Sequence, residues 1–141
     1  MVASLALLTG LAAAMVVARI VYTGESTYAN LIWNLILAWI PLLLALFLYD
    51  AARRGAGSWL LLSVGIAWLL FFPNAPYLMT DFQLLRDWTE APIWYDVVLL
   101  STAAWTGLTL GFASLYLVHV VVRRRLGALT VWAGVAEPPR A

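Results

Sequence analysis

The sequence predicts an all-α polytopic membrane protein: a four-helix transmembrane bundle with a broken third helix and a short interfacial helix. Hydrophobic residues make up 65% of the chain and charged residues only 11%, and the mean hydropathy is +0.92. Soluble domains are about 45–50% apolar and about 25% charged. A chain of 141 residues holds about four spans of about 20 apolar residues each. We therefore expect a single bundle over residues 1–125 and a short tail over 126–141.

The first two spans are predicted at about residues 2–21 and 29–49. The first could also be a signal peptide, but it has no positively charged start and its apolar stretch is too long, so we interpret it as a retained helix. A polar turn at 22–28 separates the two spans. Charged residues and glycines between Asp50 and Ser58 mark the loop that ends the second span.

The third span is predicted at about residues 59–72 and stops at an unusual polar segment. At 1.5 Å per residue it reaches about 22 Å before Pro73, which is less than the roughly 30 Å hydrocarbon core. Asn74 and Pro76 follow directly. Either the helix breaks near one membrane interface, or it continues, kinked, towards Leu78.

A short interfacial helix is expected after this break. Thr80 and Gln83 have the spacing of a capping box, which predicts a helix from Thr80 to about Trp88. The fourth span then runs from about 93 to 122. The apolar residues after Arg125 are too few to cross a bilayer, so 126–141 is predicted to be a cytoplasmic or interfacial tail.

The distribution of arginine predicts the orientation in the membrane. The chain has no lysine, and its arginines cluster at 53–54 and 123–125, next to apolar spans. Two helices separate the clusters, so both can lie in the cytoplasm, with both termini also inside and the polar break outside. Because these arginines indicate topology, we expect the lipid bilayer, and no nucleic acid, as a partner. Cysteine is absent from the chain, which excludes a disulfide or a thiolate metal site within it.

Three segments resemble a known family. They are 30–41 (NLIWNLILAWIP), 72–81 (FPNAPYLMTD) and 94–96 (WYD), followed by a glycine-rich fourth span. Over about residues 30–117 the chain is similar to the prokaryotic integral membrane protein family "domain of unknown function 1361". The resemblance implies a multi-pass protein of the prokaryotic inner membrane, with no established activity. It also implies further spans after this region, so we expect the C-terminal part of the family pattern to be missing.

Five polar residues are candidates for a functional site. Asn30 and Asn34 share one face of the second span, where they could tie helices together or bind a ligand or ion. Asn74, Asp81 and Asp96 are expected to meet at one membrane boundary. They could simply cap helices, bind a cation, or act as acid and base, since ionisable groups inside a membrane are functional candidates.

His119 is the single histidine and could bind haem or chlorophyll magnesium. It precedes Arg123 by four residues, so an interfacial polar residue is the favoured interpretation. We expect no metal site and no cofactor.

Small residues form two ridges with a spacing of four. One lies on the first span and the other on the fourth: Gly10, Ala14 and Ala18, and Ala103, Gly107 and Gly111. Such ridges let helices approach closely, so we expect internal packing or oligomer contacts there.

No catalytic motif is evident, which favours a non-enzymatic structural or accessory subunit of a membrane assembly, in contact with other membrane subunits or with further copies of itself. A small transporter or channel component, with its polar site at the break, is the alternative. An interfacial enzyme that uses Asp81 and Asp96 is the third hypothesis.

Overall fold

The protein is a bundle of long helices. The computed structural model describes residues 1–26, 28–81 and 91–136, with side chains through Gly127 in the last helix. The helices are α1 (Val2–Thr23), α2 (Ala29–Arg53), α3 (Ser58–Phe71), α4 (Asn74–Tyr77) and α5 (Ile93–Ala136). Four helical segments are long and apolar enough to cross a membrane: Val2–Thr23, Ala29–Arg53, Ser58–Asp81 and Ile93–Gly127. The predicted all-α, multi-pass fold class is confirmed.

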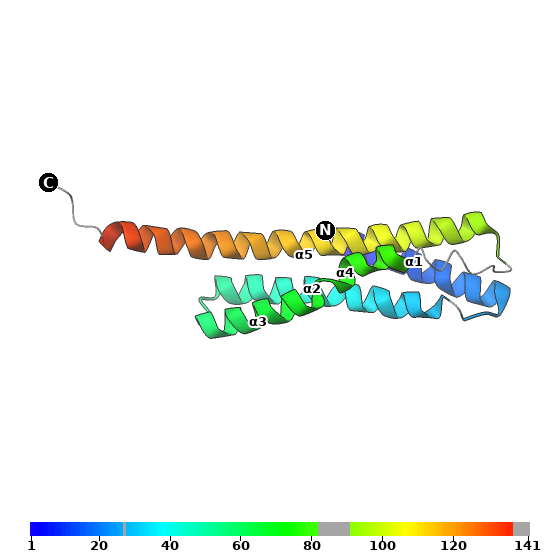
Figure 1. Cartoon of the computed structure of the whole chain (residues 1–141), viewed down its shortest axis with the longest axis horizontal. Helices are drawn as coiled ribbons and strands as arrows, with labels where there is room; N and C mark the ends of the chain where they lie inside the picture. Colours follow the sequence, from blue (N-terminus) through cyan, green and yellow to red (C-terminus); the bar gives the residue numbers. More distant parts are fainter. Residues whose placement is uncertain (27, 82–90, 137–141) are drawn as a thin grey trace.

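The long helix α2 lies at the centre of the bundle and packs against α1, α3, α4 and α5 (Figure 1). α1 lies beside the first part of α5, whereas α3 lies towards the other end of the bundle (Figure 1). The bundle therefore has two different ends. One holds the α1–α2 turn and the start of α5, and the other, which we call the arginine end, holds the α2–α3 turn and Arg123–Arg125.

Glycines close both turns between the first three helices. Gly24 ends α1 with φ 71°, and its N–H donates to the carbonyl of Ile20 at 2.8 Å. Gly55 has φ 77° in the α2–α3 turn. These left-handed conformations disfavour a side chain, so glycine is required where α1 and α2 stop.

The polar break in the third span is a kink in a helical path. α3 ends at Phe71, α4 begins at Asn74, and a 3₁₀ segment continues from 78 to 81. The backbone at Phe72 and Pro73 stays right-handed helical, but Pro73 has no N–H to donate. Of the two predicted alternatives, the kinked continuation is the one observed.

Thr80 is the predicted start of the interfacial helix, and it lies one residue before the end of the described segment 28–81. Thr80 belongs to the 3₁₀ segment, and its hydroxyl donates back to the carbonyl of Tyr77 at 2.7 Å. The hydroxyl thus satisfies a backbone carbonyl of the preceding turn. Gln83 and the interfacial helix to about Trp88 lie outside the described residues.

The helix that contains the predicted fourth span is longer than the span itself. α5 continues past Val122 to Ala136, through the first part of the predicted tail. No proline occurs between Ile93 and Ala136, and the next one is Pro138, so the sequence contains no strong breaker at the arginines. Residues 137–141 lie outside the described residues.

The two small-residue ridges have different environments. Ala103, Gly107 and Gly111 are buried, and a Cβ at Gly107 would collide with the carbonyl oxygen of Ala75 and lie 2.7 Å from Leu78 Cδ1. This ridge lets α4 lie close against α5. The ridge on α1, Gly10, Ala14 and Ala18, is exposed, so it does not pack inside the bundle. Leu5, Ala12 and Val16 on the opposite face of α1 are buried instead.

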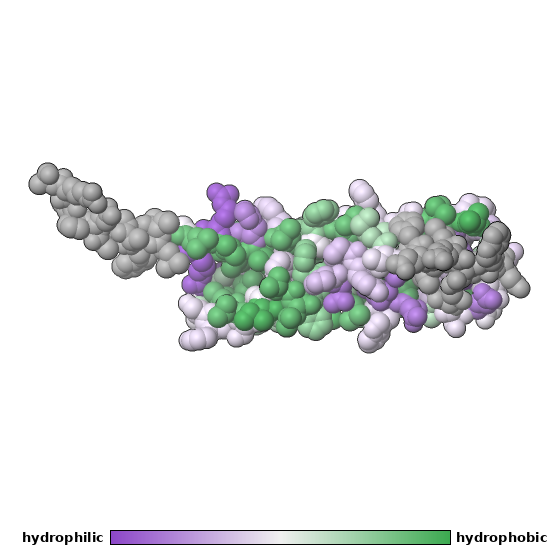
Figure 2. Space-filling view, viewed as in Figure 1, coloured by the Kyte–Doolittle hydropathy of each residue, from purple (hydrophilic) through white to green (hydrophobic). Residues whose placement is uncertain are grey.

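Much of the apolar surface remains uncovered. Trp68 is the one buried residue of α3, so most of that helix faces outwards. Figure 2 shows apolar surface over α3 and the neighbouring length of α5. In a bilayer this surface meets lipid or another protein.

Candidate functional site

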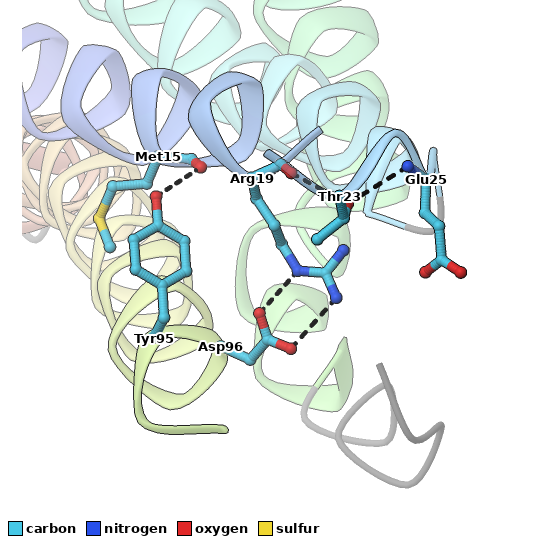
Figure 3. A network of polar contacts seen from close by, with 6 residues as sticks. All are labelled: Met15, Arg19, Thr23, Glu25, Tyr95 and Asp96. Carbon is cyan, nitrogen blue, oxygen red and sulfur yellow. Dashed lines mark hydrogen bonds and ion pairs between the residues drawn. The ribbon is translucent and has the colours of Figure 1, made fainter. Parts of the chain in front are cut away.

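A buried ion pair joins the start of α5 to the end of α1. Arg19 Nε lies 2.7 Å from Asp96 Oδ1, and Arg19 Nη2 lies 3.2 Å from Asp96 Oδ2 (Figure 3). Arg19 is 1% exposed and Asp96 is 3% exposed. The two side chains thus form a bidentate pair between residues that are 77 positions apart in sequence.

Aromatic rings reinforce this connection. The guanidinium carbon of Arg19 lies 4.0 Å from the centre of the Tyr28 ring, and Tyr28 is fully buried at the start of α2. Tyr95, next to Asp96, donates its hydroxyl to the carbonyl of Met15 at 2.8 Å (Figure 3). Three helices therefore meet around one guanidinium, with a cation–π contact on one side and a carboxylate on another.

A second polar contact joins α2 to the segment after the break. Asn34 Nδ2 donates to Asp81 Oδ2 at 3.1 Å and to Asp81 Oδ1 at 3.4 Å. Both residues are half-buried. Asn34 therefore holds the carboxylate of Asp81 against α2, and the Asp81 residue is only partly buried there.

The predicted cluster of Asn74, Asp81 and Asp96 divides among different partners. Asp81 bonds to Asn34 and Asp96 bonds to Arg19. Asn74 Nδ2 donates to the carbonyl of Phe71 at 3.0 Å, which satisfies a backbone group at the end of α3. Asn30 is exposed near the start of α2.

A third contact between helices lies nearer the start of α1. The indole nitrogen of Trp39 donates to Thr9 Oγ1 at 3.0 Å, while the Thr9 hydroxyl donates to the carbonyl of Leu5 at 2.8 Å. The contact ties α1 to α2. A buried or half-buried donor in a membrane needs such a partner, because lipid offers none.

Arg19 is the main residue that sequence reasoning missed. It is not among the candidate residues above, although it lies inside the first apolar stretch. Two signals could have identified it. Ionisable residues within a span usually face the bundle interior, and Arg19 continues the helical stripe of Ala12 and Val16, which are buried.

His119 is exposed on α5. The described part of the chain contains no group of three histidine, cysteine, aspartate or glutamate side chains placed to hold a metal ion. Binding of haem or chlorophyll by His119 stays a prediction.

Comparison with known proteins gives one match. The sequence model of the family described as "Protein of unknown function (DUF1361)" matches residues 33–137. The chain belongs to the DUF1361 family. The predicted resemblance is confirmed, and the match extends beyond the expected limit at 117. No curated protein and no solved structure matches the chain.

The matched range contains some of the residues that form the polar contacts of this DUF1361 protein. It covers Asn34, Trp39, Asp81 and Asp96, whereas Thr9 and Arg19 precede it. The family description assigns no activity, so the function must be argued from the contacts themselves.

Proposed function

We propose that this DUF1361 protein is a non-enzymatic structural or accessory subunit of a membrane assembly. The observation that carries the proposal is the outward face of α1. Gly10, Ala14 and Ala18 lie opposite the buried stripe of that helix, and Leu7 and Val21 beside them are 75% and 80% exposed. An outward ridge of small residues lets the helix of another subunit approach closely in lipid.

The polar side chains support the same proposal through their partners. Arg19, Asn34 and Trp39 each donate to a residue on a different helix. Hydrogen bonds between helices in membranes contribute about 0.6–2 kcal/mol each. Polar groups used in this way hold the bundle in one shape, which suits a protein that offers a fixed surface to a partner.

The test is recovery of the assembly from native membranes in mild detergent. Ala14→Leu places a larger side chain on the outward ridge and is expected to reduce the recovered assembly, either a complex with another subunit or an oligomer of this chain. Ser63→Leu is the control, because Ser63 is also a small, exposed residue but lies on α3, away from the ridge. A wild-type protein that is recovered only as a lone monomer would contradict the proposal.

A transporter or channel component is the second candidate, and the contact between Asn34 and Asp81 favours it. A half-buried carboxylate beside a kinked helix is the kind of group that binds an ion or a proton in transporters. Flux of protons or monovalent cations into proteoliposomes should then fall with Asp81→Asn. Unchanged flux in that variant, or no flux in the wild type, would remove this candidate.

A further inference from the structure

An open groove lies between α3 and α5 towards the arginine end. Its volume is about 720 Å³. Apolar side chains from α3 and α5 form most of its walls, with Leu48 of α2 among them, and Ser58 and Arg125 lie at its polar end. Gly65 lines the groove, and a Cβ at Gly65 would meet nothing within 4 Å.

A smaller cavity of about 300 Å³ adjoins the groove at the arginine end. Three arginines line it, together with Tyr49 and Gly55: Arg53, Arg124 and Arg125. We call it the arginine pocket. The groove and the arginine pocket share Val121 and Arg125, so an apolar cavity and a cationic cavity meet along one wall.

Contacts within the protein hold these arginines in place. The guanidinium carbons of Arg53 and Arg124 lie 5.9 Å and 5.5 Å from the centre of the Tyr49 ring. Arg125 Nη2 donates to the carbonyl of Ala56 at 3.1 Å, which ties α5 to the α2–α3 turn. The pocket is therefore organised before any ligand arrives.

The charge at this end is unbalanced. Residues 48–66 and 115–127 carry five arginines and one carboxylate, Asp50. Asp50 Oδ2 lies 2.8 Å from Nε of Arg54, which does not line the pocket. Three arginines thus line one small cavity, no carboxylate is among the described residues of its wall, and an anion there would relieve the mutual repulsion of the arginines.

We propose that this end of the protein binds an anionic phospholipid, with the phosphate in the arginine pocket and an acyl chain in the groove. Arginine binds phosphate through charge-assisted, often bidentate hydrogen bonds. Basic pockets beside membrane helices are typical sites for anionic lipid head groups. Charge complementarity and the shared wall select this ligand over the helix of a partner, which would fill the groove but leave the three arginines unneutralised.

The test compares two lipids that have the same acyl chains. Protein purified in detergent is mixed with phosphatidylglycerol or phosphatidylcholine vesicles and re-isolated, and the retained lipid is measured by mass spectrometry. We expect phosphatidylglycerol to be retained and to raise the thermal unfolding temperature, and phosphatidylcholine to do neither. Glycerol phosphate, which has the phosphate but no acyl chain, is expected to give no such shift.

Variants separate the pocket from general surface charge. The double change Arg124→Gln and Arg125→Gln should weaken phosphatidylglycerol retention about tenfold. Arg123→Gln is the matched control, because Arg123 lines neither cavity. Gly65→Leu should fill part of the groove and reduce retention without lowering the stability of the lipid-free protein, since a Cβ at this position meets nothing within 4 Å.

Three results would overturn the proposal. The first is equal retention of both lipids by the wild type. The second is an Arg123→Gln effect as large as that of the double change, which would indicate general surface charge. The third is unchanged retention in Gly65→Leu together with capture of a second protein at the groove, which would identify a helix as the occupant. Circular dichroism of each variant confirms that its helices are intact.

Discussion

The ion pair between Arg19 and Asp96 is the contact on which the packing of α1 against α5 most depends. Both charges are removed from water, and each compensates the other. The sequence placed Asp96 among the candidate residues but missed its partner, because a single arginine near the end of an apolar stretch resembles a topology signal. Pairing between residues far apart in the chain depends on tertiary packing, which hydropathy does not reveal.

Removing one member of the pair should destabilise the protein strongly. Arg19→Leu or Asp96→Leu leaves an uncompensated buried charge, and we expect a loss of about 3–5 kcal/mol in the free energy of unfolding. The double change Arg19→Met and Asp96→Leu should recover most of that loss. Reversible unfolding in mixed detergent micelles measures all three. Single variants within about 1 kcal/mol of the wild type would show that the pair contributes little in the membrane.

The kinked third span is the element whose packing depends most on individual residues. Prolines and Asn74 in the sequence predicted an irregularity there, and its approximate position is as expected. The direction of the chain after the kink could not be predicted, because it is decided by the close approach of Ala75 and Leu78 to α5 at Gly107. The close approach is possible because Gly107, about 30 positions further along the chain, has no side chain to fill the space.

Gly107→Ala is therefore expected to destabilise the bundle by about 1–3 kcal/mol, because the new Cβ would displace the backbone of α4. Gly65→Ala serves as the matched control. It adds the same methyl group within a helix where nothing lies within 4 Å, so it should be neutral or stabilising by up to about 1 kcal/mol. Thermal unfolding of both variants in the same detergent gives the comparison. Equal effects of the two changes would contradict the close contact between α4 and α5.

The number of membrane helices in the whole molecule is predicted more directly by hydropathy than the details of their packing are. Four apolar stretches separated by polar turns predicted the helices, since each must satisfy its backbone hydrogen bonds internally in lipid. α5 continues past the predicted end of the fourth span at about residue 122, because charged residues do not stop a helix. The sequence does not predict which apolar faces remain uncovered, because α1 and α3 are apolar on most sides. Those faces could be identified only in the structure.

The orientation of the whole bundle in the membrane is testable. We expect the arginine end in the cytoplasm and the α1–α2 turn outside. In the cysteine-free chain, Ser26→Cys in that turn should react with a membrane-impermeant maleimide added to intact cells, and a fluorescent protein fused after Ala141 should be fluorescent. Protection of Ser26→Cys in intact cells, with labelling only after lysis, would reverse the orientation.

In the proposed assembly, α1 presents its outward ridge to another subunit. The most direct measurement is cross-linking in native membranes with a short bis-maleimide, using differently tagged copies of the chain. The cross-linker needs an accessible cysteine on the partner as well. If the partner is a second copy of the chain, Ala14→Cys supplies that cysteine. If the partner is another subunit, a cysteine is introduced on its facing helix. We predict a discrete adduct of higher mass from Ala14→Cys and none from Ser63→Cys, an exposed position on α3. If Ala14→Cys stays monomeric against both kinds of partner, or if both positions cross-link equally, the proposed role as a subunit of a membrane assembly is contradicted.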